Sequence, residues 1–212
     1  MRKFLLTIAA LALAAPLSAA PITFHSGDGG DILLSAGALT TITPHAVWGD
    51  VSPFAGLPAD TAKWISYANT GIGGIIAPNA ATRTRPDATA VFSRQFALGG
   101  TGQFDLWILT DDTAAVDLIG PGGTTVLFDP FLGQIDPCAP GGTGIPIGCV
   151  NADMGHKSMT LGPGAYDLRV YAFQTNKDVF GAQYAGSVPE PASLMLLGTG
   201  LIGLLARRRI QK

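Results

Sequence analysis

Apolar and polar residues alternate with a period of two between residues 90 and 120, which is typical of half-buried β-strands. Glycine- and aspartate-rich turns at 99–102 and 110–113 divide this region into three segments, so we predict two successive hairpins. The residues predicted to share the buried face are Phe92, Phe96, Leu98, Phe104, Leu106, Ile108, Val116 and Leu118.

Arg94 interrupts this alternation because it falls on the apolar face. A guanidinium group in that position needs a carboxylate or several carbonyl groups around it. We expect a structural ion pair, with Asp105, Asp111 or Asp112 as the partner.

Weaker strand patterns occur at 38–43, 63–67, 164–172 and 181–188, and the glycine- and proline-interrupted stretch 69–87 is predicted to be a surface loop. The chain has 28 Gly and 15 Pro, and no long amphipathic helix pattern is found. Frequent turns without helical periodicity predict an all-β fold, a sandwich or barrel.

The N-terminus has the layout of a secretory signal peptide. Arg2 and Lys3 precede an apolar stretch at 4–15 and a small-residue region at 16–21. Cleavage by signal peptidase is predicted after Ala19, because a later cut would place Pro21 first in the mature chain. A retained N-terminal membrane helix is the alternative, but the apolar stretch is short for that role.

The C-terminus contains an extended peptide, an apolar run and a basic cluster in direct succession. The peptide is Val188-Pro189-Glu190-Pro191, and its prolines should keep it extended and open to an enzyme. The apolar run 192–206 is shorter than the roughly 20 residues of a stable membrane helix, and Arg207, Arg208 and Arg209 should stay cytoplasmic. A plain tail anchor would explain the run and the arginines, but not the Pro-Glu-Pro.

This tail resembles the PEP-CTERM sorting signal of Gram-negative bacteria that make extracellular polysaccharide. The resemblance implies exosortase as a partner, transient residence in the inner membrane, cleavage near Pro189 to Pro191, and delivery to the cell surface or matrix. The predicted organisation is a signal peptide at 1–19, a body at 20–186 and a sorting segment with a short transmembrane helix at 187–212.

The body resembles the jelly-roll β-sandwich domains that are similar to galactose-binding modules. The motifs that carry this resemblance are Phe92-x-Arg94-x-Phe96-x-Leu98, Phe104-x-Leu106-x-Ile108 running into Asp111-Asp112, and Gly164-x-Tyr166-x-Leu168-x-Val170. The resemblance covers residues 40–186 and implies a jelly-roll fold.

Charge excludes one class of partner. The body has 7 Lys and Arg against 14 Asp, a formal net charge of −7, because the other bases and the only glutamate lie in the removable ends. Such a surface repels phosphate backbones, which disfavours nucleic acid. A polysaccharide partner would be neutral or bridged by cations.

Cys138 and Cys149 flank a glycine- and proline-rich segment, and in an exported protein we expect them to form a disulfide. A metal site at these cysteines is the alternative, with His156 as the nearby histidine. Asp28 and Asp31, and the corner at Asp111 and Asp112, are weak candidates for calcium ligands or ordinary turn residues.

Trp107 has outward parity between Leu106 and Ile108, so it is a candidate for stacking on a sugar ring unless a second packed layer covers it. No pattern of an activated nucleophile or phosphate loop is found, so no enzyme activity is predicted. The sequence favours a non-enzymatic envelope or matrix protein associated with exopolysaccharide or biofilm. A carbohydrate-binding module and a glycan hydrolase with an unrecognised site are the alternatives.

Overall fold

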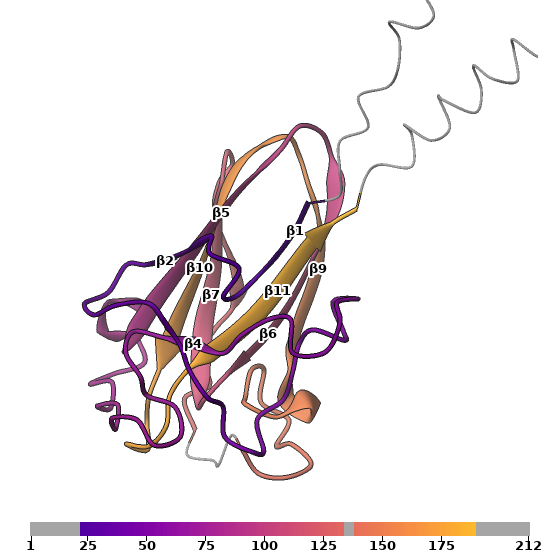
Figure 1. Cartoon of the computed structure of the whole chain (residues 1–212). Coiled ribbons are helices and arrows are strands. Elements are labelled where there is room, and N and C mark those ends of the chain that lie inside the picture. The colour runs from indigo at the N-terminus through magenta and orange to yellow at the C-terminus, as the bar shows by residue number, and fades with distance from the viewer. Residues whose placement is uncertain (1–21, 134–137, 190–212) are drawn as a thin grey trace, which may run out of the picture.

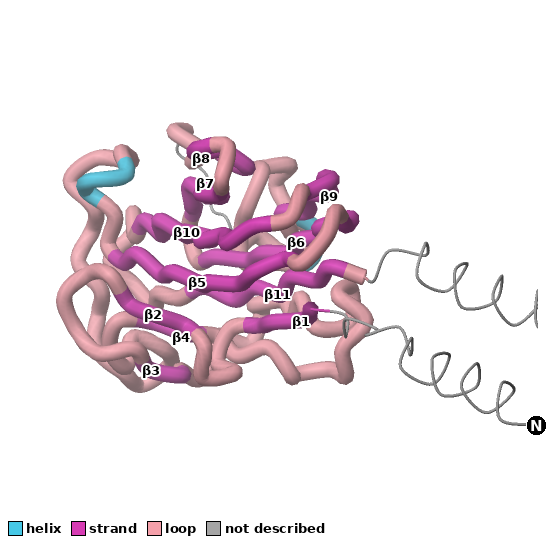
Figure 2. Tube along the Cα trace, turned by 90° about the horizontal axis from the view of Figure 1, so that it is seen from above, coloured by secondary structure: helices cyan, strands magenta, loops and turns pink. Residues whose placement is uncertain are grey.

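The computed structural model describes residues 22–133 and 138–189, which fold into two antiparallel sheets packed face to face (Figures 1 and 2). The six-stranded sheet contains β1 (Ile22–His25), β3 (Thr40–Thr41), β4 (Ile65–Ser66), β6 (Gly102–Thr110), β9 (Gly155–Leu161) and β11 (Ala182–Val188). The five-stranded sheet contains β2 (Asp31–Leu33), β5 (Ala90–Leu98), β7 (Thr113–Gly120), β8 (Gly123–Phe128) and β10 (Gly164–Phe173). Two single-turn 3₁₀ helices lie at Arg85–Asp87 and Asn151–Asp153.

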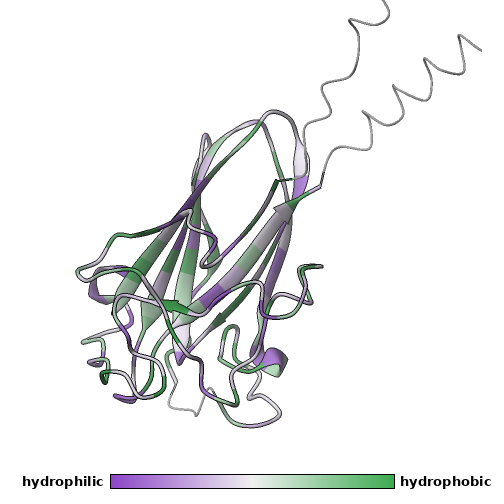
Figure 3. Ribbon diagram, viewed as in Figure 1, coloured by the Kyte–Doolittle hydropathy of each residue, from purple (hydrophilic) through white to green (hydrophobic). Residues whose placement is uncertain are grey.

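The strand order is β3-β4-β11-β6-β9, with β1 also beside β11, in one sheet and β2-β5-β10-β7-β8 in the other. The predicted all-β jelly-roll sandwich is therefore confirmed. The inward positions of β5, β6, β7 and β10 fill the space between the sheets, as the alternation predicts. Figure 3 shows how hydropathy varies from residue to residue along the strands. Phe92, Phe104, Leu106 and Ile108 are completely buried there.

The predicted pair of hairpins is wrong. β5 and β7 belong to the five-stranded sheet, whereas β6 between them belongs to the six-stranded sheet, so both connections cross from one sheet to the other. Alternation specifies which face of a strand is buried but not which sheet the strand joins, because both sheets bury their inner faces against each other. The hairpin that does form in this region is β7–β8, where Gly123 adopts a φ of 103°.

A second apolar layer covers part of the outer face of the six-stranded sheet. Loops before β4 and before β9 place Trp48, Trp64 and Val150 against the outward residues Leu109 and Ala185. The two indole rings lie 4.2 Å apart, and Trp64 Nε1 donates a hydrogen bond to the carbonyl of Gly49. For the outer face of β6, the sequence allows either an exposed Trp107 or a second packed layer, and the structure contains such a layer.

Strand β11 lies in the middle of its sheet. Residues 182–187 of β11 pair with β6, while β4 contacts the first residue of β11 and β1 its last four on the opposite side (Figure 1). Within the described residues no helix has the length and hydropathy to cross a bilayer, and the predicted membrane run 192–206 and signal peptide 1–19 lie outside those residues.

We expect Gly186→Ala to destabilise the body by about 1–3 kcal/mol, the usual cost of overpacking a core. A Cβ atom at Gly186 would lie 2.3 Å from the Phe24 ring, which is itself buried between the sheets. Equilibrium unfolding in urea measures the change. Gly99→Ala is the control, because a Cβ atom there meets open space, and equal losses in the two variants would refute the packing argument.

Candidate functional site

The start of the predicted sorting peptide is part of the sandwich. Ser187 lies opposite Thr23 of β1 and Asp105 of β6, and Val188 lies opposite Ile22 of β1. Val188 is only 6% exposed, and a Cβ atom on Gly102 would meet its side chain at 2.6 Å.

The prediction that the peptide is open from Val188 onward is therefore wrong for its first residue, because strand pairing rather than proline controls that position. Pro189 is exposed. The other predicted sorting and membrane-flanking residues, Glu190, Pro191, Arg207, Arg208 and Arg209, lie outside the described residues.

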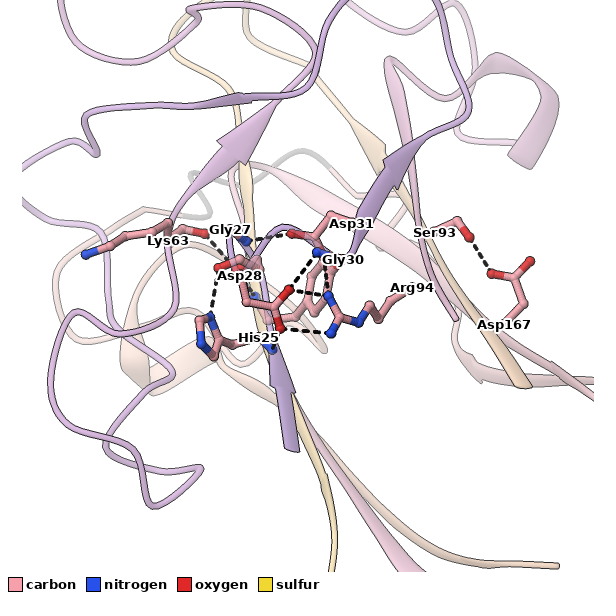
Figure 4. A network of polar contacts seen from close by, with 11 residues as sticks. His25, Gly27, Asp28, Gly30, Asp31, Lys63, Ser93, Arg94 and Asp167 are labelled. Atoms are coloured by element: carbon pink, nitrogen blue, oxygen red, sulfur yellow. Dashed lines mark hydrogen bonds and ion pairs between the residues drawn. The ribbon is translucent and has the colours of Figure 1, made fainter. Parts of the chain in front are cut away.

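Arg94 lies on the inner face of β5, as predicted, but its predicted partners are wrong. It pairs with Asp28 and Asp31, which belong to the β1–β2 turn and the start of β2 (Figure 4). Nη2 donates to Asp28 Oδ2 at 2.8 Å, Nη1 bonds the other carboxylate oxygen, and Nη1 lies 3.8 Å from Asp31. The guanidinium also lies over the Phe24 ring, 5.3 Å from its centroid.

The two carboxylates of this cluster have opposite pKa shifts. Burial raises the pKa of Asp31, although its oxygens accept hydrogen bonds from the Tyr184 hydroxyl and the Gly27 N–H. Burial acts in the same direction on Asp28, but the bonds from Arg94 and from backbone N–H groups outweigh it and lower the pKa of Asp28. Arg94 thus lies beside both carboxylates, and calcium at Asp28 and Asp31 stays a prediction.

Asp111 and Asp112 form the turn between β6 and β7 and are 2% and 3% exposed. Asp112 adopts a φ of 61°, and its Oδ2 accepts a hydrogen bond from the N–H of Thr175, so the carboxylate fixes the turn to the segment after β10. Burial raises the pKa of Asp112. Calcium at this corner stays a prediction.

Cys138 and Cys149 form the predicted disulfide. Cys149 is completely buried in the second apolar layer, and the Cys138 sulfur lies 3.3 Å from an Asp111 oxygen. The bridge thus ties the segment before β9 to the outer layer and to the β6–β7 turn, rather than pinning only a surface loop.

Trp107 does point outward from β6, and it is half-buried. Its ring stacks on His156 of β9, with centroids 4.9 Å apart and planes 15° apart, and the second apolar layer packs against it. His156 Nε2 lies 3.6 Å from Asp105 of the same face. Sugar stacking by Trp107 stays a prediction, made at a ring that is already partly covered.

A groove of about 400 Å³ lies near the ends of β4 and β10, between the loop that precedes β3 and the long loop before β5. Tyr67 and Phe180 pack with ring centroids 5.9 Å apart, and the Tyr67 ring lines the groove together with Asn79 and Asp87. Asn79 Nδ2 donates to the Thr175 carbonyl at 2.8 Å. No sequence pattern predicts this groove, because its residues come from irregular segments without periodicity.

Comparison with known proteins separates the tail from the body. Residues 187–209 match the family model of the PEP-CTERM protein-sorting motif. The chain therefore carries this sorting motif, which implies processing by exosortase and indicates export and membrane-associated sorting in a Gram-negative bacterium. No curated protein matches the chain.

Solved structures similar to the body include carbohydrate-binding modules. A family 35 module from Paenibacillus barcinonensis is 12% identical, with a TM-score of 0.37 over 80% of this chain and 99% of the module. A family 35 module from Clostridium thermocellum is 8% identical, with a TM-score of 0.37 over 79% and 98%. The C-terminal family 6 module of LamC from Zobellia galactanivorans is 10% identical, with a TM-score of 0.34 over 80% and 99%. Similarity at this level says nothing about a ligand of this chain.

We expect Asp28→Asn to lower the unfolding free energy by about 1–2 kcal/mol at pH 7, since the charged pair with Arg94 keeps some solvent contact. The pKa of Asp28 is below the ordinary value of 3.8. Its ionised form therefore stabilises the fold fully above about pH 4, and that contribution disappears as the pH falls further. Unfolding measured between pH 7 and pH 2.5 should show the two proteins converging at the acid end. Asp129→Asn, at an exposed carboxylate 3.7 Å from Arg85, is the control, and a pH-independent difference for Asp28→Asn would contradict the ionic origin.

Proposed function

We propose that the chain is a non-enzymatic protein of the cell surface or the extracellular polysaccharide matrix, associated with exopolysaccharide and biofilm after cleavage by signal peptidase and exosortase. The observation that carries this proposal is the position of the sorting motif. The last strand of the sandwich ends at Val188, and Pro189 is exposed directly after it. Cleavage near Pro189 to Pro191 would therefore release a body with both sheets complete.

The polar groups that catalysis would require are used within the fold. Asp112 is buried and bonded to the backbone at Thr175, so Asp111 and Asp112 are a poor acid–base pair for a glycan. His25 Nδ1 contacts the Ser26 carbonyl, and His156 faces Asp105. This use of the side chains supports a non-enzymatic body over a glycan hydrolase with an unrecognised site.

Carbohydrate binding is a second candidate function, and the Tyr67 groove favours it. An aromatic ring beside an amide and a carboxylate is a suitable surface for a sugar, because the ring covers the apolar face while the polar groups bond the hydroxyls. The net charge of −7 in the body favours a neutral polysaccharide. The groove lies near the start of β11, away from the end where Val188 leaves the sandwich.

Intact mass of the protein from its native host tests the sorting proposal. We expect a mass that lacks both ends, 1–19 and the tail beyond the cleavage site, and that rises by two hydrogens on reduction of the Cys138–Cys149 bridge. Cell-bound and secreted fractions are measured separately. A mass that includes Lys212 in both fractions would mean that the tail is a permanent anchor.

Retention of the processed body on the host's neutral polysaccharide tests the second candidate. Tyr67→Ala should weaken retention about two- to tenfold, the effect of losing one aromatic contact. Trp107→Ala is the matched variant on the outer face of the six-stranded sheet. If only Trp107→Ala weakens retention, the sugar site lies on that face rather than in the Tyr67 groove. If the wild-type body is not retained, the body does not bind this polysaccharide, and a purely structural matrix role is the better account.

A further inference from the structure

The last two residues of the strand are paired within the sheet. The family match begins at Ser187, yet Ser187 is paired on one side with β6 and on the other with β1, and Val188 is paired with β1. An enzyme that binds an extended peptide through its main chain needs those N–H and C=O groups to be free. In the folded body Pro189 is the first residue beyond this pairing, and it is exposed.

Strand β1 is held firmly in this place. Phe24 is 2% exposed, and its ring lies across Gly186 and contacts Phe96, with centroids 5.2 Å apart. At the other end of the pairing, the N–H of Ser26 donates to the Tyr184 carbonyl at 2.9 Å and the Ser26 hydroxyl accepts from the N–H of Tyr184 at 3.1 Å. Strand β1, which follows the predicted signal peptide, thus holds the end of β11, which directly precedes the exposed Pro189.

We propose that β1 is a lock that sets the N-terminal limit of exosortase cleavage. With β1 docked, the enzyme reaches Pro189 and the residues after it, and the processed protein keeps Val188 as its last buried residue. Undocking of β1 frees the main-chain groups of Val188 for cleavage, whereas Ser187 remains paired with β6. This inference deepens the proposed function and rests on it for the cleavage itself.

Two proline substitutions distinguish the loss of β1 pairing with Val188 from the general effect of placing a proline in β1. The backbone bond between Ser26 and Tyr184 marks a hydrogen-bonded pair, so the pair Ile22 and Val188, four residues along the same ladder, is hydrogen-bonded too. Thr23 lies between such pairs and points its N–H away from β11. Ile22→Pro therefore removes a ladder bond to Val188, whereas Thr23→Pro in the same edge strand does not.

The experiment expresses wild type, Ile22→Pro and Thr23→Pro as full chains in the native host and maps the C-terminal residue of each product by mass spectrometry. We expect wild type and Thr23→Pro to end at Pro189 or later. In Ile22→Pro, products that end at Val188 or earlier should rise about fivefold, the effect of about 1 kcal/mol from one hydrogen bond. Each product is also subjected to limited proteolysis, because resistance of the body to cleavage shows that it has folded.

Two results would overturn the lock: a wild-type product that ends at or before Val188, or identical ends in wild type and folded Ile22→Pro. If Ile22→Pro does not accumulate, Phe24→Leu weakens the docking of β1 while keeping the ladder, and it should give the same shorter products in smaller amount. A mass through Lys212 in every protein would refute exosortase processing rather than the lock, so the two failures are distinguishable.

Discussion

The six-stranded sheet depends on the insertion of its last strand between strands from distant parts of the chain. Residues 182–187 of β11 pair with β6, and β4 and β1 pair with β11 on its other side, so residues 185–188 meet residues 22–25. Such non-local pairing is slow because the loop-closure entropy is lost before the contacts form. An exported chain can complete this sheet only after residue 188 has crossed the membrane. At that stage only the sorting tail, which directly follows β11, has not yet been exported.

The ion cluster beneath β1 is a second consequence of that arrangement. Arg94 belongs to the five-stranded sheet, and Asp28 belongs to the turn after β1. Tyr184, whose hydroxyl donates a hydrogen bond to Asp31, belongs to β11 of the six-stranded sheet. The cluster therefore connects both sheets at the place where the first and last strands meet. Removing one partner would leave a poorly solvated charge, which costs more than the pair contributes. A Cβ atom at Gly30 would lie 2.0 Å from Arg94 Nη1, so a larger residue there would displace the guanidinium.

The sequence predicted what short-range patterns encode. The inward positions of β5, β6, β7 and β10 follow from a period of two, and the disulfide follows from two cysteines in an exported protein. Sheet membership did not follow, since Phe92 and Phe104 bury equally well in one sheet or in two that face each other. The partner of Arg94 did not follow either, because Asp28 is 66 residues away and is brought close only by the pairing of β2 with β5.

Trp48 and Trp64 show why the sequence does not decide whether the outer face of β6 is exposed or covered. Neither lies in a regular strand, and their burial depends on loops that fold back over Leu109 and Ala185, which no periodicity records. That layer and the Tyr67 groove both arise from irregular segments, and most of these gather at the end of the sandwich opposite to the end of β11 (Figure 1). β11 spans seven residues, a separation of about 20 Å at 3.3 Å per residue. A body processed near Pro189 would therefore keep its point of attachment at one end and present the groove at the other, so that attachment and any contact with polysaccharide need not compete for the same surface.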